Sequence, residues 1–303
     1  MSRTGYKLSQ VLALYGISRS RWYEWCGAPK SEPRKRANLQ APLQCEVEAV
    51  LKFREQHDGV GYRKFTYMLN DANIAYLPES TVFRILKTHS LLAPKVPTDP
   101  HQAAKEYKDK PATVHQHWHM DIAYIKVRGV FYFLIMMLDG YSRFLLDWEL
   151  MPDMLGSSVE AFVQRVREKY PFATPKLITD NGCQFVSRDF KQLLYRIDIQ
   201  HVRTRRNHPQ TNGKAERWNG SVKHEAIYPA APQSFKEAWQ VLHEWAYFYN
   251  HQRLHAAVHF LRPADIFFGR DKSILTKRSQ NVINARASRI EINRSSFCRQ
   301  TIP

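Results

Sequence analysis

Cysteine is scarce in this sequence, and its spacing argues against a zinc site. The four cysteines, Cys26, Cys45, Cys183 and Cys298, form no Cys-x-x-Cys pair and have no spacing typical of zinc ligands. We therefore expect no structural zinc centre. Reduced thiols of this kind fit a cytosolic protein.

Long hydrophobic runs are also missing. The most apolar stretch, Val130 to Leu138, is far too short to span a bilayer and favours a buried strand. The chain does not open with a cationic segment followed by an apolar one, so no signal peptide is expected. The sequence predicts a cytoplasmic protein without a membrane partner, associated with the nucleoid if it comes from a bacterium.

Acidic residues are few compared with basic ones. Twenty-eight Asp and Glu stand against 45 Lys and Arg, which gives a formal net charge of +17. A polyanion is the natural partner, because each cation that neutralises a phosphate releases a condensed counterion. A basic housekeeping protein or a membrane-surface binder would carry similar charge. The ordinary hydrophobic fraction of 44% and the length of 303 residues indicate two or three folded domains.

Residues 1–27 have the pattern of a short helical hairpin. Apolar residues at helical spacing favour a helix over Lys7–Leu14, and Ser18 is suited to cap a second helix that ends at Trp25. The Gly16-Ile17 turn between them is typical of a helix-turn-helix, whose second helix would present Arg19 and Arg21 to DNA. Many hairpins without DNA contacts share this pattern.

A second helical unit is expected over residues 42–92. It lies between two linkers, residues 28–41 and the proline-rich residues 93–114. Helices are predicted over Leu43–Arg54 and Tyr62–Asn70, and Pro78 is placed as a first-turn proline of a third. That third helix carries Arg84 and Lys87, so a second helix-turn-helix is favoured over a plain helical bundle.

From residue 115 to residue 268 the pattern changes to strands followed by alternating helices and strands. The expected strands are His117–Val127, Val130–Asp139, Arg143–Leu150, Lys176–Thr179 and Ile199–Val202. The expected helices are Ser157–Lys169, Arg188–Arg196, one from Gly213 and Ser234–Asn250. This order predicts an α/β, ribonuclease-H-like domain. Residues 269–303 are expected to be a basic, DNA-touching or partly disordered extension.

Three carboxylates in this domain could serve phosphodiester chemistry. Asp121 lies inside a strand, where an isolated charge is costly, Asp180 closes an apolar strand, and Glu216 begins a helix. Two Mg²⁺ ions held by such acids could activate a nucleophile and stabilise a leaving oxygen. For Asp180 alone, a turn or helix cap would be the simpler role. Lys223 shares the Glu216 helix face, where it could reach a phosphate or only solvent.

Five segments resemble the successive motifs of integrase-core transposases of insertion sequences. They are WHMDIAYI, LDGYSR, ITDNGCQF, HPQTNGKAERWNGSVKHE and YNHQRLH, and 35 residues separate Asp180 from Glu216 as in that family's Asp, Asp, Glu triad. GISRSRWYEW, GYRKFTYMLN and STVFRILK are similar to the N-terminal region of OrfB-type transposases of the IS-three group. One departure is Arg253-Leu254-His255, where the family often has Arg-Pro-His.

The resemblance implies a DNA transposase whose triad, Asp121, Asp180 and Glu216, holds two Mg²⁺ or Mn²⁺ ions. It would expose a 3′-hydroxyl at the element end and direct it at target DNA. The implied partners are double-stranded DNA, further copies of the chain, and an upstream-frame transposition protein. DNA contacts are expected from the basic loop and from the helix after it, at Arg205, Arg206, Asn212, Lys214 and Lys223. Asp139 and Asn181 are expected to lie next to the three metal-binding carboxylates and to hold them in place without binding the metal.

Other interpretations stay open. His115, His117 and His119 alternate as if on one strand face, but nothing completes a tetrahedral metal site, so a structural role is favoured. The main alternative function is a DNA-binding regulator with an inactive integrase-like core. A nonspecific ribonuclease-H-type nuclease is a weaker alternative, because it would not need tandem helix-turn-helix units.

Overall fold

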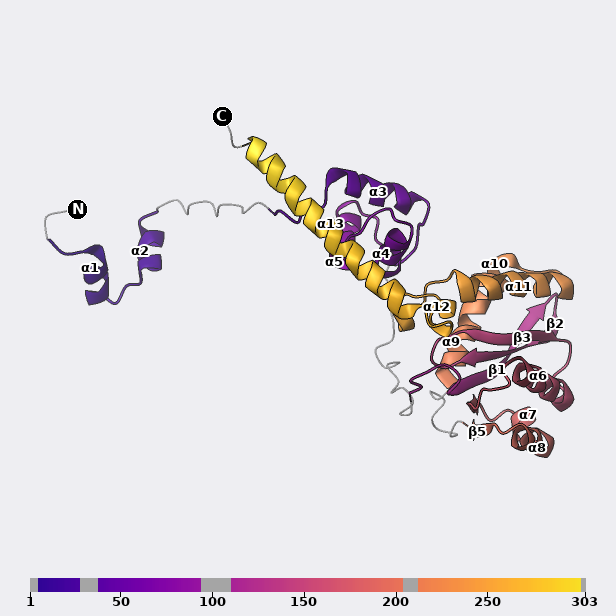
Figure 1. The fold of residues 1–303 in the computed structure, drawn as a ribbon. Coiled ribbons are helices and arrows are strands. Elements are labelled where there is room, and N and C mark those ends of the chain that lie inside the picture. The colour runs from indigo at the N-terminus through magenta and orange to yellow at the C-terminus, as the bar shows by residue number, and fades with distance from the viewer. Residues whose placement is uncertain (1–4, 28–37, 94–109, 204–211, 301–303) are drawn as a thin grey trace. The chain divides into compact units, whose positions relative to one another are not determined.

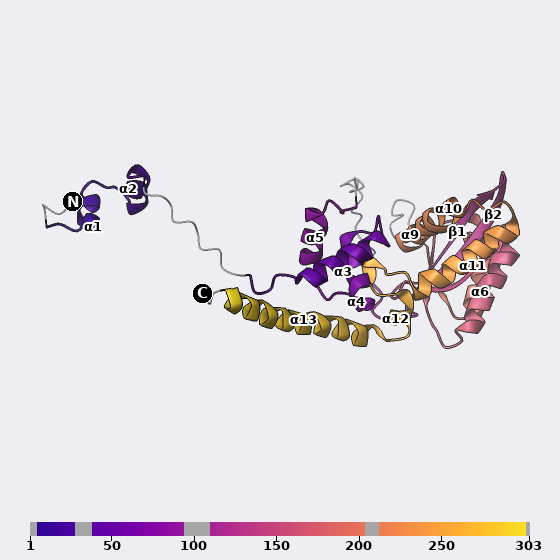
Figure 2. The same ribbon diagram turned by 90° about the horizontal axis from the view of Figure 1, so that it is seen from above.

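The computed structural model describes residues 5–27, 38–93, 110–203 and 212–300. It divides into two compact units, one formed by Pro42–Ser288 and the other by residues 1–41 together with 289–303. Figures 1 and 2 show the chain in two views. The predicted linkers, residues 28–41 and 93–114, lie mostly outside the described residues.

The larger unit begins with three helices, as predicted for residues 42–92. They are α3 (Gln44–Glu55), α4 (Tyr62–Asp71) and α5 (Glu79–Thr88). Buried side chains such as Val50, Phe65 and Leu86 form a core of their own between them. Pro78 is the N-cap of α5 and not a first-turn residue, because its extended ψ of 151° places it just before the helix. We call α3–α5 the helical domain.

A five-stranded mixed sheet follows, and all five strands were predicted. Its strands are β1 (His117–Val127), β2 (Val130–Asp139), β3 (Leu145–Met151), β4 (Lys176–Thr179) and β5 (Gln200–Arg203). Their order across the sheet is β3-β2-β1-β4-β5. The first three strands form an antiparallel meander, and β4 and β5 add in parallel to β1.

The β1–β2 hairpin closes at the Arg128-Gly129 turn. Both residues have positive φ, +48° and +87°. Two successive positive φ values match the right-handed twist of a tight hairpin. The turn therefore fixes the register that pairs Val127 with Val130 and, further along, Asp121 with Met136.

Helices cover both faces of the sheet and produce three layers (Figure 1). One face carries α6 (Gly156–Lys169), α7 (Cys183–Val186) and α8 (Arg188–Arg196), which pack on strand residues such as Trp118 and Met120. The other face carries α9 (Gly213–Val222) and α11 (Phe235–His251), which pack on Ala123 and Ile125. With this strand order, the domain is ribonuclease-H-like, as predicted.

The helix that begins at Gly213 changes its hydrogen-bonding pattern after its tenth residue, Val222. It continues as a π-helical segment, η3 (Lys223–Ile227), and as a last turn, α10 (Tyr228–Ala230). Ala231 then ends it in the left-handed region, with φ of +42°. A π-helical turn widens the helix and rotates the residues that follow, so spacing rules that hold in α9 no longer apply beyond Val222.

The last part of the chain differs from the prediction of a partly disordered extension. After η4 (Ala256–Val258) and α12 (Pro263–Phe267), one 30-residue helix, α13, runs over Asp271–Gln300. Ile274 and Leu275 anchor its start against a small apolar cluster. Beyond them, polar contacts such as those of Arg278 with Asp71 hold the first part of the helix in the larger unit, and the sequence shows only a weak apolar stripe.

The smaller unit contains the predicted N-terminal hairpin. Its helices are α1 (Leu8–Leu14) and α2 (Arg19–Trp25), and the Ser18 hydroxyl accepts a hydrogen bond of 3.3 Å from the Arg21 backbone N–H, as expected of an N-cap. In residues 5–27 only Leu12 is buried. In the same unit, the Asn293 amide donates to the carbonyls of Leu39 and Ala41. None of the described helices is both long and apolar enough to cross a membrane.

Candidate active site

The three predicted acids come from three neighbouring elements: two adjacent central strands of the sheet and a helix that packs on it. Asp121 lies in the middle of β1, Asp180 directly follows β4, and Glu216 is in the first turn of α9. β1 and β4 are parallel neighbours, so the chain leaves β4 beside β1. Asp121 shares its strand face with Ala123 and Ile125, the face that α9 covers.

Electrostatics couples the three acids. The pKa of Asp121 is raised to about 6, mainly by burial and then by the negative charges of Asp180 and Glu216. Hydrogen bonds from the Ile122 backbone N–H (3.0 Å) and the Asn219 amide (2.8 Å) partly offset that rise. Mutual repulsion of this kind is what a bound cation relieves.

The donor set suits a hard divalent cation. Carboxylate oxygens are the ligands that Mg²⁺ takes in proteins, and the hydrogen bonds that Asp121 accepts in the described residues come from uncharged donors. Within the described ranges, no three His, Cys, Asp or Glu side chains are grouped closely enough to hold an ion together. The acids are thus coupled through their charges without a closed ligand cage.

Asn219 is a residue that the sequence analysis missed. It lies three residues after Glu216 on α9, nearly buried, and donates 2.8 Å from its side-chain nitrogen to Asp121 Oδ2. Its side-chain oxygen has no hydrogen-bond partner among the described residues. The three-residue spacing in the segment GKAERWNG places Glu216 and Asn219 on one helix face, and that spacing was the available signal.

The Asp180-Asn181-Gly182 segment is a tight turn, as predicted. The Gly182 backbone N–H donates 2.9 Å to Asp180 Oδ1. A Cβ on Gly182 would approach that oxygen to 3.1 Å and the Gln184 side chain to 2.7 Å, so the carboxylate can fold back only over a glycine. Asn181 is exposed beside it.

Asp139 stabilises a turn. It is fully buried and accepts hydrogen bonds from the backbone N–H groups of His115 (2.7 Å), Tyr141 (3.2 Å) and Ser142 (2.7 Å), and from the Ser142 hydroxyl (2.6 Å). All these donors belong to the LDGYSR turn or to the segment just before β1. The contacts give Asp139 a structural role, and none of them joins it to the three acids.

Asn212, predicted as a DNA contact, is buried in this structure. The side chain is only 2% exposed, and it donates to the carbonyl of Met120, the residue before Asp121. Asn212 thus pins the start of α9 to β1. Its neighbour Lys214 is half-buried and donates 3.0 Å to the Gly140 carbonyl.

The other predicted DNA contacts stay predictions. Four of them are exposed in their helices: Arg19, Arg21, Arg84 and Lys87. The guanidinium of Arg84 also donates to Ser80 and Thr81 within its own helix. Lys223 is half-buried at the start of the π-helical segment. Arg205 and Arg206 lie outside the described residues.

The alternating histidines are part of the core. His117 and His119 are buried at the start of β1, and His115 accepts a hydrogen bond of 3.1 Å from the Trp118 indole. Burial lowers the pKa of His119 well below its ordinary value, and Lys214 and Arg143 lower it further. A neutral ring inside the fold agrees with the structural role favoured from the sequence.

The YNHQRLH segment joins α11 to the sheet. Asn250 exchanges two hydrogen bonds with the backbone of Leu145, 2.8 Å and 3.0 Å, and so continues the pairing of β3. Arg253 forms a two-pronged ion pair with Glu225, at 2.6 Å and 2.7 Å. Leu254 is buried where the resembling family often has proline.

Two family models match this part of the chain. Both describe an integrase core domain, one over residues 111–209 and the other over residues 197–263. Together they span residues 111–263, about half of the 303 residues.

The chain belongs to the integrase core domain family. The curated proteins that it resembles are transposases of insertion sequences. It is 27% identical to the IS904 transposase of Lactococcus lactis over 49% of the chain and 59% of that protein. It is 23% identical to the IS150 transposase of Escherichia coli over 87% of the chain and 94% of that protein. It is 28% identical to the IS986/IS6110 transposase of Mycobacterium tuberculosis, over 48% of the chain and 55% of that protein.

Viral integrases are similar among solved structures. The magnesium complex of the HTLV-2 integrase catalytic core matches 52% of this chain and 98% of that one, at 17% identity and a TM-score of 0.40. The simian T-cell lymphotropic virus intasome, solved with a PP2A regulatory subunit, matches 72% of this chain and 74% of that one, at 15% identity and a TM-score of 0.47. The fold assignment rests on the strand order and the family models.

Proposed function

We propose that this chain cuts DNA at the ends of an insertion sequence and joins them to target DNA, with Asp121, Asp180 and Glu216 as the metal-binding residues. The observation that carries the proposal is that acids from β1, β4 and α9 act on one another: burial, and then the negative charges of Asp180 and Glu216, raise the pKa of Asp121 to about 6. Repulsion of this strength favours a divalent cation as the fourth member of the site.

Each part of the chain has a distinct task in this proposal. A bound pair of Mg²⁺ or Mn²⁺ ions would supply the activation of water or a 3′-hydroxyl and the stabilisation of the leaving oxygen. Asn219 holds Asp121 Oδ2, and the turn at Gly182 holds Asp180 Oδ1, so two of the three carboxylates are positioned before any ligand binds. The exposed Glu216 is free to move toward the other two.

Three kinds of partner follow from the same proposal. The first is double-stranded DNA, contacted by the helical domain and by the N-terminal hairpin through Arg19, Arg21, Arg84 and Lys87. The second is further copies of this chain, because one transposition event joins two element ends. An upstream-frame transposition protein would complete the active assembly.

The decisive experiment compares the wild type with Glu216→Gln on labelled DNA duplexes that carry an element end, with Mg²⁺ or Mn²⁺. The variant keeps the shape of the side chain but removes one charge, so cleavage and joining should fall by about 100-fold or more while DNA binding is unchanged. Glu244→Gln is the matched control, because it removes the same charge from an exposed position of α11.

The alternative, a DNA-binding regulator with an inactive core, predicts a different result. In that case wild type and Glu216→Gln would both bind DNA, and neither would cut or join strands even when the upstream-frame protein is supplied. That outcome would overturn the proposal.

A further inference from the structure

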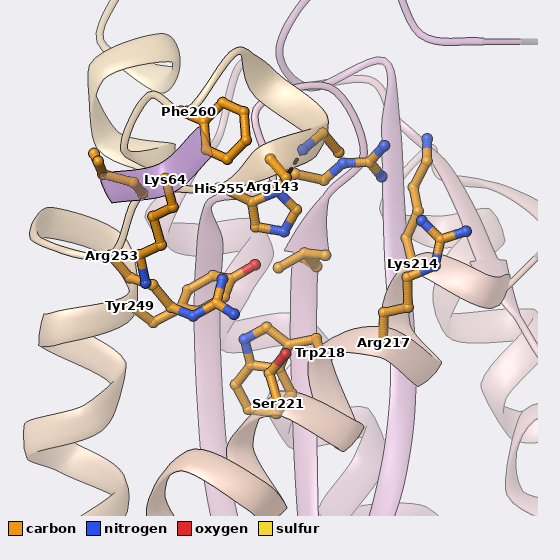
Figure 3. Close-up of a pocket in the computed structure, with 14 residues that line it drawn as sticks. Lys64, Arg143, Lys214, Arg217, Trp218, Ser221, Tyr249, Arg253, His255 and Phe260 are labelled. Carbon is orange, nitrogen blue, oxygen red and sulfur yellow. Dashed lines mark hydrogen bonds between the residues drawn. The ribbon is translucent and has the colours of Figure 1, made fainter. Parts of the chain in front are cut away.

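A basic pocket lies on the side of α9 that faces away from the three acids. It has a volume of about 420 Å³ and opens between α4 of the helical domain, α9, α11 and the segment after α11 (Figure 3). Among the described residues five cations line it and no acidic residue does: the cations are Lys64, Arg143, Lys214, Arg217 and Arg253. We call this cavity the basic pocket.

Helix α9 is shared between the candidate active site and the basic pocket. Lys214, Arg217 and Ser221 recur at helical spacing and line the pocket. Glu216 and Asn219 occupy the opposite side of the same helix, toward Asp121. A ligand in the basic pocket would therefore be held one helix diameter from the acids.

Positive charge predominates around the basic pocket. Glu225 pairs with Arg253 but does not line the cavity. Lys64 has its pKa lowered, first by burial and then by the charge of Arg253. The pKa of His255 is lowered to about 4 by burial and by Arg253, Arg143 and Arg217, so this ring stays neutral beside them. Such a cavity selects an anion.

The floor of the basic pocket offers a hydrogen-bond donor and an apolar surface. Trp218 is only 3% exposed, and its indole N–H has no hydrogen-bond partner among the described residues. Its ring nitrogen lies on the side that faces Arg253 (Figure 3). Tyr249 and Phe260 complete an aromatic wall. An unpaired buried donor beside several cations fits a phosphate oxygen, and the aromatic wall fits a base or sugar.

We infer that the basic pocket binds one nucleotide of a DNA strand, with its phosphate held by Lys64, Arg217 and Arg253. The inference rests on the proposed function, because it takes DNA as the substrate. The volume is within the range of about 300–1,000 Å³ found for small-ligand sites, which is adequate for one nucleotide. Since Lys64 belongs to the helical domain and Arg217 to the core, the bound strand would contact both.

The test is DNA binding without divalent metal, so that no strand is cut. Labelled oligonucleotides are titrated with wild type and with Lys64→Met, which keeps the aliphatic stem and removes the charge. Affinity should fall several-fold, and the slope of log affinity against log salt should become shallower by about one phosphate contact, 0.7 to 0.9. The matched control is Lys52→Met, an exposed lysine of α3 in the same helical domain.

A second pair guards against a folding defect. Arg217→Met should produce the same loss, and Arg188→Met, from an exposed position of α8, should not. If both pocket variants match their controls, the inference is overturned while cutting and joining by the wild type still support the proposed function. If free deoxynucleotide stabilises wild type but not Lys64→Met, and DNA binding is unchanged, the pocket serves a free nucleotide and the inference is again overturned.

Discussion

The charged form of Asp121 destabilises the folded protein in the absence of metal. The side chain is half-buried and near two other acids, so its charged form is costly in the folded protein. Its folded-state pKa of about 6 is above the ordinary value of 3.8. Between about pH 4 and pH 6 the unfolded chain ionises this group while the folded chain keeps the proton, so stability falls as pH rises through that window.

Asp121→Asn should therefore make the metal-free protein more stable at pH 7.5. The expected gain in unfolding free energy is about 1–3 kcal/mol, because the amide removes the cost of burying a charge. At pH 4 the gain should nearly vanish, since the wild-type carboxyl is then protonated. Urea unfolding at the two pH values measures the difference.

The control for this prediction is Asp198→Asn, because Asp198 is exposed. It should leave stability almost unchanged at both pH values. Added Mg²⁺ should stabilise wild type more than Asp121→Asn, because ions that bind only the folded protein raise its stability. A loss of stability in Asp121→Asn at pH 7.5 would mean that the native protein already compensates this charge.

The sequence predicted which acids belong to the candidate site better than it predicted how they are held. The position of Asp121 inside an apolar strand and the spacing of Asp180 and Glu216 were visible in the chain. The burial of Asn212 was not, because it depends on α9 packing over β1 at Met120. Asparagine is usually a surface residue, so the sequence gives no sign that Asn219 is buried. Its hydrogen bond to Asp121 forms only because α9 packs over β1.

At the scale of elements, α13 shows where periodicity loses its predictive power. All five strands were predicted because alternation of apolar residues and tight turns are local signals. For α13 the decisive contacts are polar and distant in sequence. Arg278 is buried and donates to both Asp71 carboxylate oxygens, at 2.6 Å and 2.8 Å, and to the carbonyls of His259 and Phe260.

These contacts make Arg278 a bridge between the helical domain and the segment after α11. The guanidinium also lies 4.9 Å from the ring centre of Tyr67, which stacks on Phe260. Three elements of the larger unit thus share one buried cation. Lys64 of α4 and Phe260 both line the basic pocket. Arg278 therefore holds together the two segments that carry them.

Arg278→Met should destabilise the larger unit by about 1–3 kcal/mol, because it leaves the partly exposed Asp71 carboxylate without its cation and two carbonyls without donors. Differential scanning calorimetry is expected to show the helical domain melting apart from the core. Arg286→Met is the control, since Arg286 is exposed on the same helix. A double-mutant cycle with Asp71→Ala should show a coupling of about 1 kcal/mol or more. Additive effects would contradict the bridge.

At the scale of the whole molecule, positive charge is spread over several parts. The formal net charge of +17 belongs to the entire chain, but exposed arginines occur in the N-terminal hairpin, the helical domain and the core. Overall charge attracts DNA from any direction and steers association. Local contacts are different, since only a cation that neutralises a phosphate adds to the salt dependence of binding.

The N-terminal hairpin allows these two contributions to be separated. Arg19 and Arg21 are exposed on α2, whose cap Ser18 is formed as in a helix-turn-helix. If both arginines contact phosphates, replacing them with Met should reduce the salt slope for duplex binding by about 1.8, twice the value of about 0.9 per contact. Fluorescence anisotropy between about 50 and 200 mM salt, the range over which such contacts are lost, measures it.

The control pair is Lys191→Met with Arg196→Met, two exposed cations of α8. Both double variants lower the net charge of +17 by two, so any effect of overall charge is the same in each. Equal slopes would mean that the hairpin acts only through that overall charge and is not a DNA-binding element. A smaller slope for the hairpin pair alone would place α2 on the phosphate backbone, and the tandem helical units would then hold DNA while the core carries out the chemistry.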